Sequence, residues 1–157
     1  MTWRELFLPF RKVLKRPRNP LMPLQLSTLG DHIRKVRLEK GLLQRDVAEL
    51  LNVCEDSVTH WENGFAQPRV QHYPLIFSFL GYYPFPHETE SIAGKLQQWR
   101  FSIGLTQVEC GTYLKADIRN VRDWERKKKV PSLKRSKQIT ELWLRLPENL
   151  KQQYRFN

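Results

Sequence analysis

An internal repeat constrains the fold of this chain more than any other feature of its sequence. Residues 29–68 align without a gap with residues 92–131, which lie 63 positions later. The identical pairs are Arg37/Arg100, Gly41/Gly104, Leu42/Leu105, Gln44/Gln107, Leu51/Leu114, Val58/Val121, Trp61/Trp124, Glu62/Glu125 and Pro68/Pro131. These residue types end helices or fill cores, so the sequence predicts two copies of one small helical domain.

Each copy has the apolar spacing of short helices joined by tight turns. Gly41 and Gly104 are expected just after the first helix, where a positive φ is favourable. The second and third helices are expected over about 44–51 and 54–62 in the first copy, and over about 107–114 and 117–125 in the second. The short connection between them is typical of a helix-turn-helix motif.

A fourth helix is expected to close each copy, over about 73–80 in the first and about 132–144 in the second. Between the copies, Pro84 and Pro86 predict a linker over residues 82–87. The chain is therefore expected to consist of three parts: a basic N-terminal arm (1–28), a first domain (29–86) and a second domain with a C-terminal tail (87–157).

The charge of the chain indicates a polyanionic partner. The formal net charge is +11 and the pI is near 10.0, which favours nucleic acid first and an anionic membrane surface second. Residues 1–28 carry a net charge of +5, residues 29–86 carry −1 and residues 87–157 carry +7. Electrostatic attraction is therefore expected at the two ends of the chain.

Patterns that would indicate catalysis, a metal or a cofactor are missing from the sequence. The four histidines lack metal-ligand spacing, and there is no glycine-rich phosphate loop. Cys54 and Cys110 lie far apart without a C-x-x-C motif, which favours free thiols in a reducing cytoplasm. No apolar run is long enough to span a membrane, and no signal-peptide pattern is present. We expect neither an enzyme nor a bound cofactor.

Residues 1–14 place apolar side chains near helical spacing beside basic ones. This pattern fits a membrane-surface helix, or a segment that packs against another protomer or the first domain. Pro9 interrupts the pattern and favours packing over a membrane contact. The basic residues that follow, Lys15, Arg16 and Arg18, are expected to contact the DNA backbone.

Two strings of the first copy, L-G-D-H-I-R-K-V-R-L-E-K-G-L-L-Q-R-D-V-A-E-L-L-N-V and S-V-T-H-W-E-N-G, resemble the phage repressor and Cro family, which includes the XRE-type bacterial regulators. The second copy keeps R-x-x-x-G-L-T-Q and V-x-x-W-E. The resemblance implies an all-α protein with two tandem, four- to five-helix, lambda-repressor-like helix-turn-helix domains joined by a short proline and aromatic linker. It also implies a cytoplasmic, bacterial, nucleoid-associated protein that binds double-stranded DNA and regulates transcription.

In this family the third helix enters the major groove, while the second helix lies across the DNA backbone. Carried onto this sequence, the resemblance assigns ion pairs to Arg37 with Glu62 and to Arg100 with Glu125. The expected DNA contacts are Gln44, Arg45, Glu55, Asp56, Ser57 and His60 in the first copy, and Thr106, Gln107, Ile118, Arg119, Asn120, Arg122, Asp123, Arg126, Lys127, Lys128 and Lys129 in the second.

The two expected reading surfaces differ in chemistry. Arg119 can pair with guanine, Asn120 with adenine, and Ile118 can meet a thymine methyl group. Glu55 and Asp56 can instead accept from cytosine, or they can stabilise the helix N-terminus, and the sequence leaves both roles open. We therefore expect the second domain and the N-terminal arm to supply most of the attraction to DNA.

The sequence supports a main function and an alternative. The main function is a sequence-specific transcriptional regulator, with repression favoured. The alternative is a DNA-targeting or assembly subunit in which one helix-turn-helix domain docks a protein. Three aromatic residues of the near-neutral first domain, Phe65, Tyr82 and Tyr83, are expected to be exposed and motivate this alternative. The sequence also leaves open whether the chain forms a homodimer.

Overall fold

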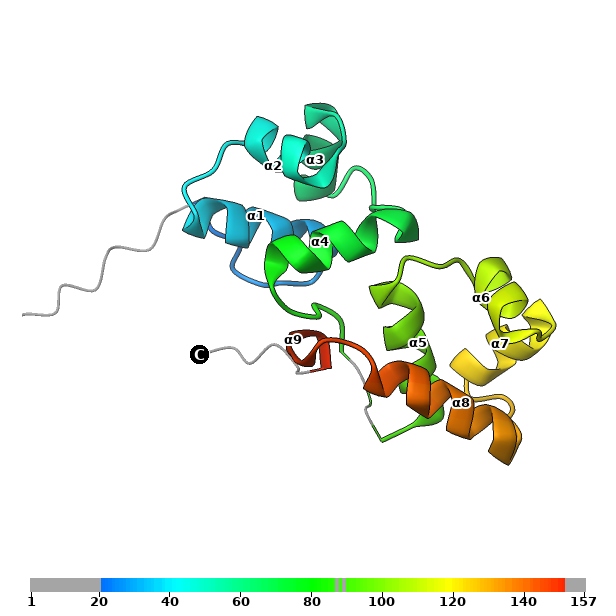
Figure 1. The fold of residues 1–157 in the computed structure, drawn as a ribbon. Coiled ribbons are helices and arrows are strands. Elements are labelled where there is room, and N and C mark those ends of the chain that lie inside the picture. The colour runs from blue at the N-terminus through cyan, green and yellow to red at the C-terminus, as the bar shows by residue number, and fades with distance from the viewer. Residues whose placement is uncertain (1–20, 87, 89, 152–157) are drawn as a thin grey trace, which may run out of the picture.

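The computed structural model describes residues 21–86, 88 and 90–151, and over these residues it is helical without a strand (Figure 1). The elements are α1 (Leu29–Glu39), α2 (Gln44–Leu51), α3 (Glu55–Glu62), the 3₁₀ turn η1 (Val70–His72), α4 (Tyr73–Leu80), α5 (Ile92–Ser102), α6 (Gln107–Leu114), α7 (Ile118–Glu125), α8 (Leu133–Leu144) and α9 (Glu148–Lys151). The expected all-α class is confirmed.

The helix bounds repeat along the chain at the offset of the sequence repeat. Helices α5, α6 and α7 each begin and end 63 residues after α1, α2 and α3. We call α1–α4 the first unit and α5–α8 the second unit. The expected second and third helices are confirmed to within one residue, with Cys54 and Asp117 at the N-cap positions.

The helix ends follow from local chemistry. Gly41 and Gly104 have φ values of 68° and 74° directly after the first helix of each unit, as expected. Asn52 and Lys115 end α2 and α6 with φ values of 53° and 50°. A left-handed residue at this point stops the helix abruptly, so the third helix of each unit can begin within a few residues.

Two hydrophobic clusters hold the helices together. The first contains Leu29, Ile33, Val36, Val47, Ala48, Leu51, Val58, Trp61, Ile76, Phe77, Phe79, Leu80 and Tyr83. The second contains Leu96, Trp99, Cys110, Leu114, Val121, Trp124, Ile139 and Leu146. Trp61 and Trp124 are buried in equivalent places, which confirms that they belong to the core.

Glycines let the helices approach closely at two places. A Cβ atom on Gly30 would lie 1.8 Å from the carbonyl oxygen of Trp61, so only glycine allows α1 to lie this near α3. A Cβ atom on Gly111 would lie 2.9 Å from the oxygen of Ala116. These contacts fix the third helix of each unit against its neighbours.

The stretch expected to be a linker lies between α4 and α5, and its aromatic residues pack against the first cluster. Tyr83 is 1% exposed and belongs to the first cluster, and Phe85 packs against the same cluster. Burial of these rings removes apolar area from water and holds the linker against the first unit. The segment is therefore part of the first unit's core.

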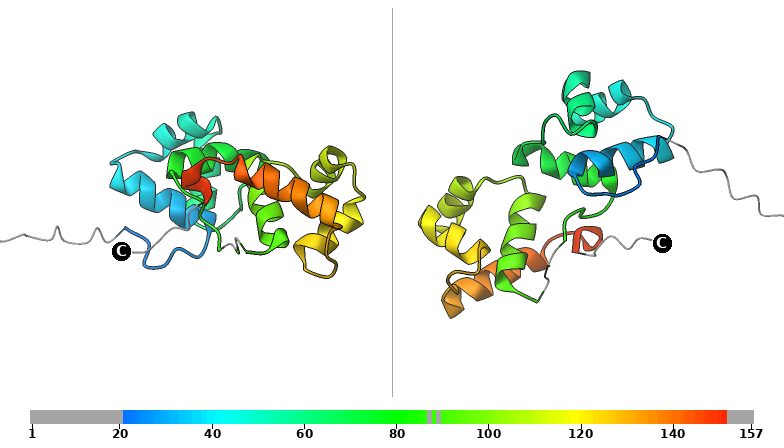
Figure 2. Two further views of the ribbon diagram at one scale, coloured as in Figure 1. Left: turned by 60° about the horizontal axis from the view of Figure 1, so that its bottom comes forward. Right: turned by 180° about the vertical axis from the view of Figure 1, so that it is seen from behind.

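Aromatic rings join the two units. Phe101 of α5 lies 5.3 Å from Tyr73 of α4 and 5.5 Å from Phe85, measured between ring centroids. Figures 1 and 2 show α4 and α5 between the α2–α3 pair at one end and the α6–α7 pair at the other. The two third helices therefore lie far from each other across a packed interface.

The short helix α9 returns to the first unit. Leu150 packs against the first cluster, and Asn149 Nδ2 donates to the Gly81 oxygen at 3.2 Å. Gln98 of α5 is fully buried, and it donates to the Leu150 oxygen while it accepts from Trp143 Nε1 at 2.6 Å. Both units thus share a set of contacts near the end of the described chain.

None of the described helices combines the length and the apolar character needed to cross a lipid bilayer.

Candidate nucleic-acid interface

A buried ion pair holds the third helix of the first unit. Arg37 of α1 donates from Nε to Glu62 Oε1 at 2.6 Å and from Nη2 to Oε2 at 2.7 Å. Its Nη1 also donates to the Leu42 oxygen at 3.1 Å. The Glu62 side chain is 1% exposed. A bidentate pair at this depth ties the C-terminal end of α3 to α1 and to the turn before α2.

The second unit repeats this arrangement atom for atom. Arg100 Nε donates to Glu125 Oε1 at 2.6 Å, and its Nη2 donates to Oε2 at 3.1 Å. Its Nη1 donates to the Leu105 oxygen at 2.8 Å. The Glu125 side chain is 4% exposed. The residues that the resemblance paired therefore lie together in both units.

A glutamine at the start of the second helix extends each pair. Gln44 Nε2 donates to Glu62 Oε2 at 3.0 Å, and Gln107 Nε2 donates to Glu125 Oε2 at 2.8 Å. The oxygen of Gln44 accepts from Thr59 at 3.0 Å, whereas the oxygen of Gln107 accepts from Arg122 Nε at 3.3 Å. Each glutamine thus braces its third helix. Sequence reasoning missed Thr59 in this role, because a lone threonine carries no such signal.

Helix caps orient the second unit's reading surface. Thr106 and Glu109 form a reciprocal capping box at the start of α6, with Thr106 N donating to Glu109 Oε2 at 2.7 Å. These hydrogen bonds lower the pKa of Glu109. Asp117 caps α7 by accepting from Arg119 N at 2.7 Å. In the first unit Leu43 and Cys54 occupy the cap positions without a side-chain cap.

The α3 surface is acidic at its leading end. Glu55, Asp56 and His60 are exposed, and Ser57 is half-buried. Ser57 Oγ lies 3.1 Å from Cys54 Sγ, and this hydrogen bond lowers the pKa of the thiol. Two carboxylates beside the helix N-terminus repel phosphates, so the structure gives this surface no clear attraction for DNA.

The α7 surface is basic at the equivalent positions. Arg119 and Arg122 are exposed, while Ile118, Asn120 and Asp123 are half-buried. Arg119 stands where the first unit has Asp56, 63 residues earlier. The exposed guanidinium on a capped and braced helix can donate in a bidentate manner to an acceptor pair.

Four cations follow α7, and two of them have acidic partners. Lys127 pairs with Glu88, and Lys129 Nζ lies 2.9 Å from Asp123 Oδ2. The hydrogen bond from each lysine lowers the pKa of its carboxyl partner. From the sequence, all four cations were expected to contact phosphates. The pairing of Lys127 with Glu88 was missed, because Glu88 lies in another loop, 39 positions before Lys127.

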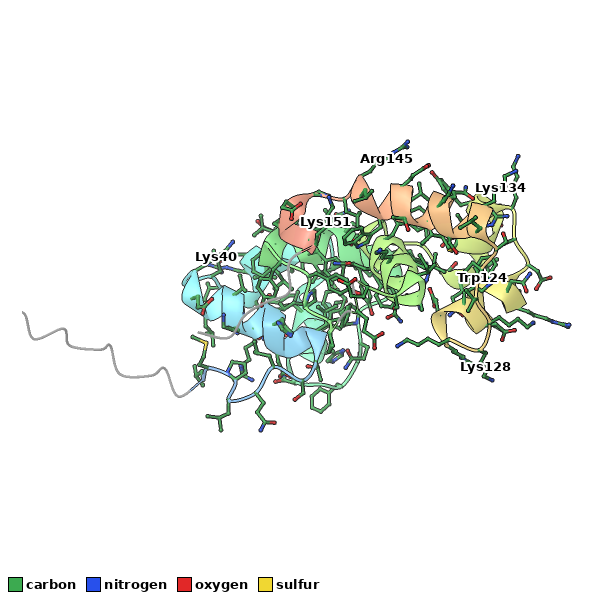
Figure 3. All side chains as sticks on the ribbon, turned by 90° about the horizontal axis from the view of Figure 1, so that it is seen from below. Lys40, Trp124, Lys128, Lys134, Arg145 and Lys151 are labelled. Atoms are coloured by element: carbon green, nitrogen blue, oxygen red, sulfur yellow. The ribbon has the colours of Figure 1, made fainter. Side chains whose placement is uncertain are left out.

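Lys128 projects outward from the second unit, whereas Trp124 lies against the helices (Figure 3). Arg126 and Lys128 are exposed, and among the described residues neither has an acidic group within ion-pair distance. Lys134 and Arg145 point outward along another edge in the same view. The exposed cations of this unit therefore face more than one direction.

The expected exposed aromatic residues of the first unit behave differently from one another. Phe65 is 79% exposed, as expected. Tyr82 is half-buried, and its hydroxyl lies 2.9 Å from His32 Nδ1. Tyr83 is buried, and burial raises the pKa of its hydroxyl. The expectation of exposure is thus wrong for Tyr83, because its ring completes the first cluster.

Lys15, Arg16 and Arg18 lie outside the described residues. Over the part of the chain that the structure describes, no group of three or more His, Cys, Asp or Glu side chains is placed to hold a metal ion.

Residues 33–85, about a third of the chain, match the family model described as Helix-turn-helix. Most of the first unit is therefore similar to a helix-turn-helix domain. No curated protein and no solved structure matches the chain.

Proposed function

We propose that the chain is a sequence-specific DNA-binding repressor of transcription whose main DNA contact is the second unit, a divergent copy of the helix-turn-helix domain. The observation that carries this proposal is the placement of Arg119. It is exposed near the start of α7, on a helix braced through Glu125 and capped by Asp117. The other unit has an aspartate at the same place.

The proposed reading surface is the leading end of α7 in the major groove. Arg119 donates to the O6 and N7 atoms of a guanine, and Asn120 pairs with an adenine. Ile118 contacts a thymine methyl group. The fixed position of α7 keeps these side chains in register with successive base pairs, because the Arg100–Glu125 pair and Gln107 hold its far end.

Phosphate contacts flank this surface in the proposal. The capping box with Glu109 already occupies the Thr106 amide, so in this proposal the amide of Gln107 at the start of α6 is the group offered to a phosphate. Arg126 and Lys128 suit the other side of the groove, since their charges are not matched by a described carboxylate. Arg122 links the two sides through Gln107.

A binding experiment with matched variants tests this proposal. Fluorescence anisotropy would compare DNA from upstream of the chain's own reading frame with random DNA of equal length. Arg119→Ala should weaken specific binding by about 1–3 kcal/mol, or roughly 5- to 150-fold, and should leave non-specific binding nearly unchanged. Asp56→Ala, at the equivalent place in the first unit, is the control and should not weaken binding.

If Asp56→Ala reduces specific affinity and Arg119→Ala does not, the first unit reads the DNA and the proposal is wrong. Repression itself needs a reporter driven by the same upstream DNA. The wild-type chain should lower reporter output, and Arg119→Ala should restore it. Increased output with the wild-type chain would contradict a repressor role.

A DNA-targeting or assembly subunit is the second candidate function. It is favoured by the exposed Phe65 and by the carboxylates at the start of α3, which suit a protein more than a phosphate. In this case the chain would bind DNA without a preference for its own upstream region. The anisotropy comparison above therefore separates the two candidates.

A further inference from the structure

The first unit carries an acidic surface that the proposed DNA contact does not use. The exposed Glu49, Glu55 and Asp56 and the half-buried Asp46 form this surface, which we call the α2–α3 acidic face. Arg45 lies 3.7 Å from Asp46. Among the described residues, no cation lies within ion-pair distance of the other three carboxylates.

Asp46 accepts from Leu43 N at 2.8 Å and caps α2, whereas Glu49, Glu55 and Asp56 have no carboxylate counterpart in the second unit. At the places equivalent to Glu49, Glu55 and Asp56, the second unit has threonine, isoleucine and arginine, and its helices have the same bounds. The like charges repel one another on a surface where α2 and α3 pack together. Glu55 and Asp56 stabilise the start of α3, which has no side-chain cap, and their exposed charges also remain accessible to a cationic partner.

Apolar side chains stand on the same pair of helices. Leu43, at the start of α2, is 53% exposed, and Leu50, near its end, is 58% exposed. Leu43 stands at the N-cap of α2 and Leu50 in its last turn, so exposed apolar groups lie at both ends of this helix. A partner for this face therefore needs cations and apolar groups together.

Residues 1–20 of this chain have that composition. They contain six Lys and Arg residues against one acidic residue, and Trp3, Leu6, Phe7 and Phe10 lie among them. The described chain begins at Leu21 on the first unit (Figure 1). Twenty residues can span up to about 66 Å at about 3.3 Å per residue, so the α2–α3 acidic face is within reach of this tether.

We propose that residues 1–20 dock on the α2–α3 acidic face of the same chain, where their basic groups pair with Glu49, Glu55 and Asp56 and their apolar groups cover Leu43 and Leu50. Attachment at Leu21 gives the segment a high effective concentration at this face, so weak contacts suffice. The docking is electrostatic in large part and is therefore sensitive to salt.

Docking on this face has a consequence for DNA binding, which rests on the proposed function. A lysine or arginine that pairs with a carboxylate of the first unit is not free to pair with a phosphate. DNA and the first unit then compete for residues 1–20, so docking lowers non-specific affinity for DNA.

A nitroxide label on Cys54 of the full chain tests the docking. Cys54 is exposed directly before Glu55, whereas Cys110 is buried and burial raises the pKa of its thiol to about 12, so the label goes to Cys54. Amide NMR signals of residues 1–20 should lose intensity at low salt through paramagnetic broadening, and should recover it at high salt.

Charge variants of the labelled chain make the test specific. The double variant E55K/D56K should abolish the broadening at low salt. The control E90K/E141K changes the net charge equally at exposed positions outside this face and should keep the broadening. Intact broadening in E55K/D56K, or no broadening in the wild-type chain, would overturn the proposal.

Mixing chains shows whether docking occurs within one molecule. A labelled chain without isotope is mixed with an unlabelled, isotope-enriched chain, and no broadening is expected in the enriched chain. Broadening there would mean that a second copy provides the segment, which overturns docking within one chain. Because no DNA is present, failure here leaves the role of Arg119 untouched, and a failed anisotropy test leaves the docking untouched.

Discussion

The two units of this protein share one scaffold and carry opposite charges on it. Residues 44–67 contain one basic and five acidic residues, a net charge of −4. The equivalent residues 107–130 contain seven basic and four acidic residues, a net charge of +3. The helix bounds at the 63-residue offset, the Arg–Glu pair and the bracing glutamine are nevertheless common to both. The frame that holds a third helix thus leaves the surface of that helix free to differ.

A helix-turn-helix unit need not carry a surface that attracts DNA. The family match lies on the first unit, whose α3 surface is acidic. The basic α7 surface lies outside the matched residues. A family model responds to core and turn residues, which the first unit keeps, whereas phosphate attraction depends on exposed charge.

The largest expected effect comes from breaking the buried ion pairs one at a time. Glu62→Ala and Glu125→Ala should each reduce the free energy of unfolding by about 3–5 kcal/mol, because each leaves a buried arginine without its partner. Hydrogen exchange with mass spectrometry would locate the loss of protection. Because each pair lies within one unit, the larger loss of protection should fall in α1–α4 for Glu62→Ala and in α5–α8 for Glu125→Ala.

The next effect concerns the contact between the units. Phe101→Ala removes a ring that packs on Tyr73 and Phe85, and should reduce the free energy of unfolding by about 3 kcal/mol, at the low end for phenylalanine because Phe101 is half-buried. Urea unfolding followed by fluorescence should then show two separated transitions. The exposed Phe65→Ala is the control. A single unchanged transition in Phe101→Ala would show that the ring contact does not couple the units.

The pH dependence of stability should also differ between the two units. Burial lowers the pKa of His32 to about 4, and the second unit has Lys95 at the equivalent position. The unfolded chain binds a proton at His32 below about pH 6.5, while the folded chain does not. Stability of the first unit should therefore fall by about 2 kcal/mol from pH 7 to pH 5.

Hydrogen exchange at the two pH values, corrected for intrinsic rates, would measure this loss. His32→Gln should flatten the pH dependence of α1–α4. An equal pH dependence in the second unit would assign the effect to other groups.

The smallest expected effect tests the cations after α7. Lys128→Ala should reduce the slope of log affinity against log salt by about 0.9 if the lysine contacts one phosphate. Lys127→Ala and Lys129→Ala should change the slope less, because Glu88 and Asp123 already pair with these lysines. Anisotropy at several salt concentrations gives the slopes. Equal slopes for Lys128→Ala and the wild type would show that Lys128 does not contact a phosphate.

Much of the scaffold could be predicted from the repeat alone. Helix ends could be predicted at Gly41 and Gly104, and core positions at Trp61 and Trp124. These predictions need only the local residue types of each repeat. The pairing of Lys127 with Glu88 could not be predicted, since it joins residues from different loops. The burial of Tyr83 was missed for a similar reason, because its segment has the composition of a turn.

By itself the sequence determined the bounds of the second, third and fourth helices of each unit and the positions of the short turns, because these depend on residue type and on local spacing. The buried ion pairs were expected only from the family resemblance, since their partners lie 25 positions apart. Only the tertiary structure decided that Tyr73, Phe85 and Phe101 join the units and that two of the four cations are matched by carboxylates. Such contacts depend on where distant segments meet, and no local pattern of residues encodes that meeting.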